Sequence, residues 1–513
     1  MNRSLNPMVA IALLVMLLAI IPQMHQAKAT GGLRVDPDAL NRLDELQQAD
    51  GTTPTAAMAT VSGNVQISVE HFLDQGKIVS HTEPSNAISA TNPENVVVGY
   101  HDRFPTFNNF VCAISFSIDG GASYSFAGFT PLSRSSDFCS DSAVAAHPDG
   151  SFYFAYLSVR NSCATSNNLP ESCTGDVLVA RLVDSGSRVD FASVAVLGDG
   201  KVNFPDKEYL VVDNGPTSPF KGTIYVTWTD FLNPNNPSAL DDGQIKLVKS
   251  SDGGHTWSRA KTLSPDALFP RAISGSNPVV GPDGTLYVFY ADFTSDTGPL
   301  TIRLVKSTDG GSTFTNPKDV ASALPSPGRF RLKNADPNFG TIPGRGFRSN
   351  SFPSGAVSPD GTVSVVWVDF PQGSCKPDGT GRPPCTNSDV RYSRSTNKGK
   401  TWSSPVNVPD DGKSTDQFFP WIAAQPNGQL NLIFGDKRLD SNNIRYDVFY
   451  TASITGGTSF EANIKVTTAS SNPGFSTFIG DYFNIAATAG SLQASWDDRR
   501  LGNNDIFGAS ILT

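Results

Sequence analysis

After residue 29 the sequence has no apolar run near the ~18 to 20 residues that a membrane-spanning helix needs, so we expect no membrane span. The 513 residues include only six Cys and six His, without a Cys-x-x-Cys or a paired-His spacing, which disfavours a zinc site. Basic residues are also scarce, because 39 Lys and Arg stand against 48 Asp and Glu. The net charge of −9 argues against binding to the phosphate backbone of nucleic acids.

The first 29 residues have the pattern of a secretory signal peptide. Arg3 provides the positive start, residues 8–21 form an unbroken apolar run, and Ala27-Lys28-Ala29 is a small-x-small cleavage pattern. We therefore expect cleavage after Ala29 and a secreted or periplasmic protein. Residues 30–63 are expected to form an N-terminal tail and linker, and residues 64–513 the folded domain.

Six cysteines are an even number, which favours disulfide bonds in an exported chain. Two pairs have the same spacing of ten residues within polar, Pro-containing segments. We expect both to form local disulfides: Cys163 with Cys173, and Cys375 with Cys385. Elimination leaves Cys112 with Cys139, although spacing alone does not determine the connectivity.

A short β-branched and aromatic run, typical of a buried strand, recurs seven times. The mean spacing is about 66 residues, since 396 residues separate the first copy from the last over six intervals. This spacing suits a four-stranded unit with loops. The runs are VVVGYHD ending at Asp102, FYFAYLS at Ser158, TIYVTWTD at Asp230, TLYVFYAD at Asp292, VSVVWVD at Asp369, LNLIFGD at Asp436 and LQASWDD at Asp498.

A second motif, Ser-x-Asp-x-Gly-x-Ser/Thr-aromatic, recurs between the expected third and fourth strands of the units. Its Asp is expected to accept backbone N–H bonds in a hairpin turn, its Gly to adopt a positive φ, and its aromatic residue to pack between layers. The clear copies are at 117–124, 250–257 and 307–314; two copies diverge at Asn397 and Thr455, and a decayed one surrounds Asp184.

This motif is the Asp-box, or bacterial neuraminidase repeat, and the chain from about residue 64 onward resembles the sialidase-like β-propeller superfamily. The resemblance implies an all-β propeller of four-stranded blades. The repeat count predicts seven blades, with a six-bladed ring as the alternative. Because the chain ends on a third strand, residues 65–70 are expected to supply the missing fourth strand and close the ring.

The strand order also predicts which face of the ring is functional. If the Asp-box turns join strands three and four, the opposite face receives the ends of the second strands and the loops into the first strands. Function should concentrate there. Residues expected on this face include Glu83, His101, Asp206, Lys207, Tyr209, Arg271, Gln417 and Asp481, together with the basic loop at 325–353.

Carboxyl groups and arginines on one face fit glycoside cleavage, in which one carboxyl protonates the leaving oxygen and Arg binds a substrate carboxylate. Sialidases use an Arg triad, a Tyr nucleophile assisted by Glu, and an Asp acid/base. The Arg-Ile-Pro signature that opens the family's first blade is absent. The resemblance implies Asp102, Tyr482 and Glu208 as catalytic residues and Arg103, Arg348, Arg438 and Arg500 as substrate-binding residues.

We therefore expect an exported, sialidase-like exo-glycoside hydrolase that acts on acidic sugars of a carbohydrate or glycoconjugate and works as a monomer. The alternatives are a non-catalytic propeller that binds carbohydrate or protein, and a polysaccharide lyase. The recurring Asp residues could instead be structural, since Asp436 with Arg438 and Asp498 with Arg500 have the same spacing. No cofactor is expected; calcium is a weak option, because carboxylates gather on one face without an EF-hand-like loop.

Overall fold

The computed structural model describes residues 59–69, 80–104, 109–160, 174–198, 203–232, 243–265, 271–293, 299–324, 347, 349–370, 387–412, 414–473 and 478–513, apart from the side chains of residues 103, 104, 109, 203 and 232. The predicted signal peptide, most of the predicted linker, Arg348 and four of the six cysteines lie outside these residues. In the described part of the chain, no helix has the length and apolar character to cross a membrane.

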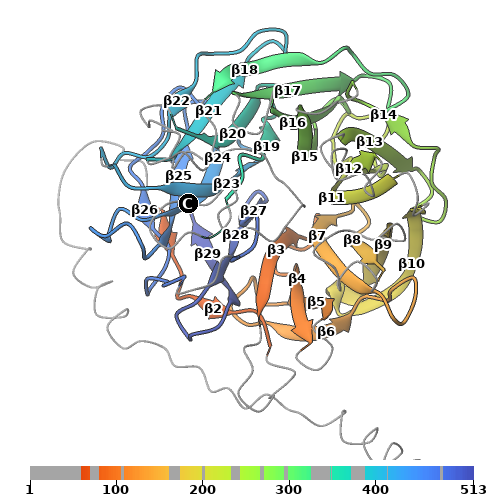
Figure 1. The fold of residues 1–513 in the computed structure, drawn as a ribbon, viewed down its shortest axis with the longest axis horizontal. Coiled ribbons are helices and arrows are strands. Elements are labelled where there is room, and N and C mark those ends of the chain that lie inside the picture. Colours follow the sequence, from red (N-terminus) through yellow and green to blue (C-terminus); the bar gives the residue numbers. More distant parts are fainter. Residues whose placement is uncertain are drawn as a thin grey trace, which may run out of the picture. The chain divides into compact units, whose positions relative to one another are not determined.

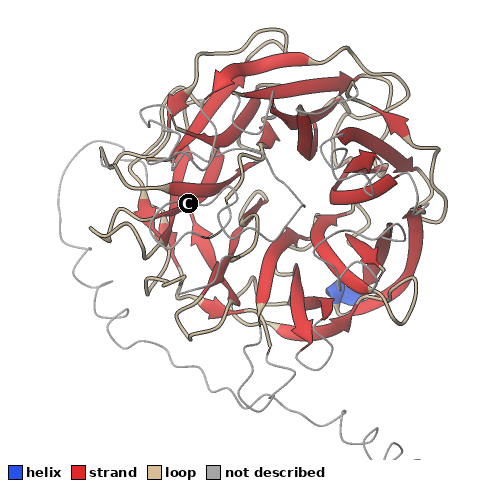
Figure 2. Cartoon of the chain, viewed as in Figure 1, coloured by secondary structure: helices blue, strands red, loops and turns tan. Residues whose placement is uncertain are grey.

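The described residues from Ala59 onward form a ring of seven antiparallel sheets, so the predicted all-β propeller with seven blades is confirmed. Figure 1 shows the first strand of each blade nearest the centre of the ring, and Figure 2 shows strands throughout with a single short helical turn among the described residues. Blade 1 contains β3 (His81–Ile88), β4 (Val96–Phe104), β5 (Asn109–Ser117) and β6 (Ser125–Phe129). Blade 2 contains β7 (Phe138–Ala146), β8 (Phe152–Val159), β9 (Gly175–Val183), the 3₁₀ turn η3 (Asp184–Gly186) and β10 (Arg188–Val196).

The next four blades repeat this order from the centre outward. Blade 3 contains β11 (Asn203–Val212), β12 (Ile224–Leu232), β13 (Gly243–Ser250) and β14 (Lys261–Thr262). Blade 4 contains β15 (Ala272–Val280), β16 (Leu286–Phe293), β17 (Leu300–Ser307) and β18 (Lys318–Leu324). Blade 5 contains β19 (Ser354–Val357), β20 (Val363–Asp369), β21 (Asp389–Ser395) and β22 (Val406–Asn407). Blade 6 contains β23 (Gln417–Ala424), β24 (Leu430–Asp436), β25 (Asp447–Ser453) and β26 (Ile464–Lys465).

Blade 7 is built from both ends of the folded chain, as predicted. Its inner strands are β27 (Asn484–Ala487), β28 (Leu492–Asp498) and β29 (Asp505–Leu512), and its outer edge is made by β1 (Thr60–Val61) and β2 (Val65–Gln66). Both N-terminal strands pair antiparallel with β29, with Thr60 opposite Leu512 and Val65 opposite Gly508. This pairing covers an edge that would otherwise offer free backbone groups to another chain.

The core lies between neighbouring blades and is built mainly from the first three strands of each blade. All residues of β8, β16 and β20 are buried, which explains why these runs read as almost continuously apolar. The aromatic residue of each Ser-x-Asp-x-Gly turn packs into the gap beside the preceding blade. For example, the indole nitrogen of Trp257 donates to Ser193 Oγ at 2.9 Å.

The Ser-x-Asp-x-Gly turns have the predicted hairpin geometry between strands three and four. Asp252 Oδ1 accepts the backbone N–H of Thr256 at 2.9 Å, and Asp252 Oδ2 accepts the Thr256 hydroxyl at 2.5 Å. Gly254 has φ +86° and donates its N–H to Ser250 Oγ. The bonds from Thr256 hold the pKa of Asp252 below its usual value, so this carboxylate is a stable structural acceptor.

The disulfide expected by elimination is present. Cys112 on β5 is bonded to Cys139 on β7, which links blade 1 to blade 2. Both cysteines are fully buried. A disulfide of this kind is typical of exported proteins.

The Asp residues that end the second strands form ion pairs within their blades, as the structural interpretation predicted. Asp436 binds Arg438 at 2.8 Å, and Asp498 binds Arg500 at 2.6 Å. Asp292 binds both Arg271 and Arg303. These pairs lie at the strand ends on one face of the ring, where they fasten the second strand to its neighbours. Similar contacts join Asp230 to Lys246 and Asp369 to Arg391.

Blade 1 replaces this cation with a buried histidine at the closure of the ring. The two ring nitrogens of His81 lie 3.3 Å from Asp102 on β4 and 3.3 Å from Asp505 on β29. Burial opposes the imidazolium charge, but the two carboxylates outweigh it and raise the pKa of His81 to about 9. The histidine therefore links blade 1 to blade 7 as a charged group.

The pKa of His81 predicts a pH dependence of stability. A raised folded-state pKa contributes stability that is complete below about pH 6.5 and is lost as the pH rises through about 9. The loss should be about 3 kcal/mol, from ~1.4 kcal/mol per pH unit. Denaturant unfolding between pH 6 and pH 10 measures it. His81→Gln should remove this fall in the free energy of unfolding with pH, whereas His255→Gln, at an exposed position, should keep it. An unchanged pH dependence in His81→Gln would show that His81 is not the group responsible.

Candidate functional site

The first strands of five blades contain the same β-bulge at the same level. In β3 the pairing jumps from Thr82 to Ser85 while β4 advances by only two residues, and β7, β11, β15 and β23 show the same shift. Each bulge holds one residue in the left-handed region of φ. These residues are Glu83 (φ 59°), Asp141 (54°), Lys207 (48°), Gly275 (68°) and Phe419 (49°).

Three adjacent blades place a charged residue in this costly conformation. Blade 4 uses Gly275, the residue that adopts a left-handed φ without a β-carbon penalty, whereas blades 1 to 3 use Glu83, Asp141 and Lys207. All three are buried, with at most 5% of their surface exposed. Local strain of this kind gathers at functional sites. The bulges of blades 1 to 3 therefore mark a candidate site.

A cavity of about 180 Å³ lies where these three bulges meet. Its wall combines charged groups with phenylalanines, an arrangement that suits a ligand with polar edges and an apolar face. The disulfide of Cys139 forms part of the wall, next to Phe138. The lining residues are Glu83, His101, Phe110, Phe138, Cys139, Ser140, Asp141, Asp206, Lys207, Phe352, Phe478 and Asp481.

His101 and Glu83 form a pair on the wall of this cavity. His101 Nδ1 lies 3.2 Å from Glu83 Oε2. Burial lowers the pKa of His101, and the charge of Lys207 acts in the same direction. The imidazole is therefore neutral near pH 7, and its Nε2 has no hydrogen-bond partner among the described residues.

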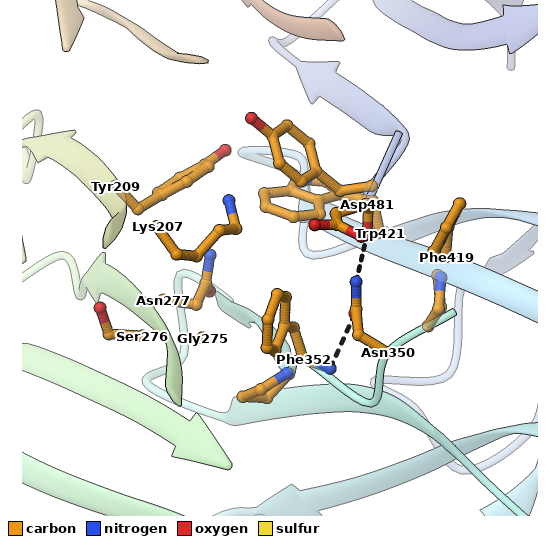
Figure 3. Close-up of a pocket in the computed structure, with 13 residues that line it drawn as sticks. Lys207, Tyr209, Gly275, Ser276, Asn277, Asn350, Phe352, Phe419, Trp421 and Asp481 are labelled. Atoms are coloured by element: carbon orange, nitrogen blue, oxygen red, sulfur yellow. Dashed lines mark hydrogen bonds between the residues drawn. The ribbon is translucent and has the colours of Figure 1, made fainter. Parts of the chain in front are cut away.

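Lys207 stands beside a layer of aromatic rings from distant blades (Figure 3). Its Nζ lies 3.6 Å from the centre of the Tyr482 ring and 5.3 Å from that of Tyr209, both within cation–π range. Trp421 contacts both tyrosine rings, with centroids 5.1 Å from Tyr209 and 6.2 Å from Tyr482. Nζ has no hydrogen-bond partner among the described residues. These side chains from blades 3, 6 and 7 meet across the centre of the ring.

Tyr482 and Glu208, two of the predicted catalytic residues, come close to this cavity. The Tyr482 hydroxyl accepts the N–H of Ser142 at 2.9 Å and donates to its carbonyl at 3.0 Å, which ties blade 7 to blade 2. Burial, with Glu83, Asp141 and Glu208 nearby, raises the pKa of Tyr482 well above its usual value. Burial also raises the pKa of Glu208, whose oxygens have no hydrogen-bond partner among the described residues.

The other predicted site residues whose side chains the structure describes, Asp102, Arg438 and Arg500, do not line this cavity. Asp102 is fully buried against His81. Arg438 binds Asp436 and Asp410, and Arg500 binds Asp498 and Asn64. The backbone of Arg103 belongs to β4, while its side chain and the whole of Arg348 lie outside the described residues.

Asp141 was missed in the sequence, although a signal for it exists. It precedes Ser158, the last residue of its second-strand repeat, by 17 residues. The same 17 residues separate Gly275 from Asp292 and Phe419 from Asp436. Counting back from the repeated strand would therefore have found the bulge position in blades 2, 4 and 6, but not in blades 1 and 3, where Glu83 precedes Asp102 by 19 residues and Lys207 precedes Asp230 by 23.

A metal site is not formed by the described side chains. No three of the described His, Cys, Asp and Glu residues lie close enough together to hold a metal ion. The carboxylates of Glu83, Asp141, Asp206 and Asp481 are instead distributed around the cavity wall.

The strain at the bulges can be measured with matched substitutions of Asp141. Asp141→Gly and Asp141→Ala both remove the carboxylate, but only Ala keeps a β-carbon in the left-handed conformation. The Gly variant should be about 1 kcal/mol more stable than the Ala variant. Chemical denaturation of both variants tests this difference, and the reverse order at this position would show that the bulge is unstrained.

No family model matches the sequence, and no curated protein is similar to it. Among solved structures, the chain is similar to a Hadza microbial sialidase (TM-score 0.45, 14% identity, 88% of this chain and 96% of that chain). It is also similar to an α-L-arabinofuranosidase from Fusarium graminearum (TM-score 0.44, 14% identity, 88% and 98%) and to an ulvan lyase of a polysaccharide lyase family (TM-score 0.49, 11% identity, 85% and 94%). These identities are too low to assign an activity to this chain.

Proposed function

We propose that this protein is an exported glycan-acting propeller that binds a single sugar unit in the cavity between blades 1, 2 and 3. The observation that carries the proposal is the set of three charged residues, Glu83, Asp141 and Lys207, held in left-handed conformations on adjacent bulges that line one cavity. Such conformations cost free energy, and they persist mainly at sites where function requires these side chains. The neighbouring Phe110 and Phe138 offer apolar surface for the face of a sugar ring.

The same residues support hydrolysis of a glycosidic bond as the activity. This reaction needs one carboxyl group to protonate the leaving oxygen and a second to activate water or to attack the anomeric carbon. Glu83 and Asp141 provide two carboxyl groups from adjacent blades. His101 contacts Glu83 at 3.2 Å and orients it, which makes His101 a positioning residue in this proposal.

The sequence pointed to acidic sugars, with sialic acid as the leading substrate of a sialidase-like Asp-box enzyme. That expectation named Arg103, Arg348, Arg438 and Arg500 as candidates to bind a substrate carboxylate. Arg438 and Arg500 are engaged in ion pairs within their blades, whereas the side chain of Arg103 and the whole of Arg348 lie outside the described residues. The described cavity wall contains four carboxylates and one lysine. This excess of negative charge disfavours an acidic ligand. We therefore propose a sugar without an acidic group.

A carbohydrate-binding propeller without turnover is the second candidate. It is favoured by Tyr482, whose hydroxyl is occupied as donor and as acceptor by the backbone of Ser142. A tyrosine in this state is not available as a nucleophile. Binding without product release would select this candidate.

A hydrolysis screen of the mature protein tests the proposal. The panel should hold fluorogenic glycosides of neutral, amino and acidic sugars, with Tyr482→Phe and Asp102→Asn measured beside the wild type. We expect release from a sugar without an acidic group, with activity retained in Asp102→Asn if that variant folds. Release from a sialoside that is lost in both variants would support the sialidase mechanism instead.

A further inference from the structure

Lys207 is a buried lysine that the described part of the chain leaves without a hydrogen-bond acceptor. Only 5% of its surface is exposed, and it lies in the bulge of β11 at a φ of 48°, a conformation that costs free energy for a residue with a β-carbon. Its ammonium group has three N–H donors. Nζ lies over the Tyr482 ring but has no hydrogen-bond partner among the described residues. A buried donor without an acceptor is costly, so Lys207 requires an acceptor from a ligand.

Lys207 stands between the cavity of about 180 Å³ and a second, smaller hollow. Lys207, Phe352 and Asp481 line both spaces, so the hollow adjoins the cavity. The hollow has a volume of about 20 Å³, which is room for one group of the size of a water molecule or a methyl group. Figure 3 shows the amino group of Lys207 pointing into this space. A sugar ring in the cavity therefore lies next to a hollow that fits one small substituent.

The rest of the wall of the hollow combines aromatic surface with polar side chains that are already hydrogen-bonded. Ser276 Oγ donates to Thr227 Oγ1 at 2.9 Å, and Asn277 Oδ1 accepts the N–H of Gly355 at 2.8 Å. The aromatic side chains are Tyr209, Phe352, Phe419, Trp421 and Tyr482. The hollow thus offers apolar surface together with the N–H donors of Lys207.

We infer that the hollow accepts the acetyl group of an acetylated neutral sugar. The inference rests on the proposed glycan-binding function and narrows its substrate class. An acetyl group joins a carbonyl oxygen, which accepts hydrogen bonds without donating any, to a methyl group, which gains free energy on apolar surface. The methyl group fills the hollow and the carbonyl accepts from Lys207 at its boundary, while the sugar ring occupies the cavity. An N-acetyl amide and an O-acetyl ester both provide this group.

The test is a binding series that changes one substituent at a time. Isothermal titration of the mature full chain compares glucose, galactose and mannose with their 2-acetamido forms, their mono-O-acetyl forms and their uronic acids. For at least one of the three sugars, an acetylated form should bind about tenfold more tightly than the parent sugar, because one hydrogen bond to a charged group adds roughly this factor. Whether the amide or the ester binds more tightly identifies the source of the acetyl group.

The size of the acyl group tests the hollow without any change in the protein. A benzoyl group keeps the carbonyl but exceeds a hollow of about 20 Å³. Replacing acetyl by benzoyl on the preferred sugar should therefore remove the gain in affinity. Equal binding of the benzoyl and acetyl forms would overturn the placement of the methyl group in the hollow.

Lys207→Met tests the donor. Methionine keeps the β-carbon and an unbranched stem, so the bulge should be retained while the N–H donors are lost. The preference for the acetylated form should fall about tenfold, whereas the affinity for the parent sugar should change by less than about twofold. Lys221→Met, at an exposed position between β11 and β12, should keep the preference. A preference that persists in Lys207→Met overturns the inference.

The outcomes separate this inference from the function on which it rests. Equal binding of acetylated and parent sugars overturns the acetyl inference and leaves the glycan-binding function standing. Tighter binding of the uronic acids overturns the acetyl inference and also the proposed preference for sugars without an acidic group. No binding of any of these sugars, together with no hydrolysis in the glycoside screen, overturns both the inference and the proposed function.

Discussion

Replacing Asp141 by Asn should lower kcat/KM on a glycoside that the wild-type protein cleaves by about 10²- to 10⁴-fold, the usual contribution of a catalytic acid or base. Asn preserves the size of the side chain and tolerates the left-handed φ of 54°. The bulge should therefore persist while the proton-transferring group is lost. Initial rates over a range of substrate concentrations measure the effect.

Two further variants show whether the loss of kcat/KM in Asp141→Asn arises in the catalytic step. Asp319→Asn removes an equivalent charge from the outer strand β18 and should retain wild-type activity. His101→Gln should change kcat and its pH profile more than KM, because His101 acts through Glu83. Wild-type activity in Asp141→Asn would exclude this carboxylate from catalysis and overturn the proposed pairing of Glu83 with Asp141.

Replacing Ile67 by Ala should destabilise the whole ring by about 2 to 5 kcal/mol, the range for truncating a buried Ile. Ile67 is fully buried, and it belongs to one hydrophobic cluster with Ile88 and Val96 of blade 1 and Ile506 of blade 7. Its backbone N–H donates to Ile506 at 2.7 Å, so its position is fixed by the closing strand. Denaturant unfolding of the full chain measures the loss.

Val65→Ala is the matched control for this prediction. Val65 belongs to the same closing segment but is only half-buried, so its truncation should cost about 1 kcal/mol or less. Equal losses in the two variants would show that closure depends on the segment as a whole and not on the side chain of Ile67.

The fold could be predicted because the blade is repeated. Seven copies of one strand pattern and the recurring turn motif specify a propeller, and the unpaired third strand at the C-terminus indicates that the ring closes through residues near Val65. The ion pair of Asp436 with Arg438 could be anticipated from the equal spacing in two blades. Repetition exposes what all blades share.

The candidate site could not be predicted as well, because it depends on what the blades do not share. Asp141, Lys207 and Glu83 occupy one structural position but have no residue type in common with Gly275 or Phe419. Their conformation follows from a shift in strand pairing, and the distance in sequence from the bulge to the end of the second-strand repeat is 17 residues for Asp141, 19 for Glu83 and 23 for Lys207, so no single spacing locates all three. The meeting of Tyr482 with Ser142, 340 residues apart in sequence, likewise requires the closed ring.

The pairing of β1 with β29 also sets the order of events during folding. Thr60 and its partner Leu512 are separated by nearly the whole folded chain, so β1 can pair only after β29, the last described strand, has been synthesised. Until β29 is complete, β28 has an open edge that is a template for pairing with other molecules. A chain that stops a few residues early therefore loses β29 and, with it, the pairing partner of β1 and β2. The ring then stays open, and aggregation competes with folding.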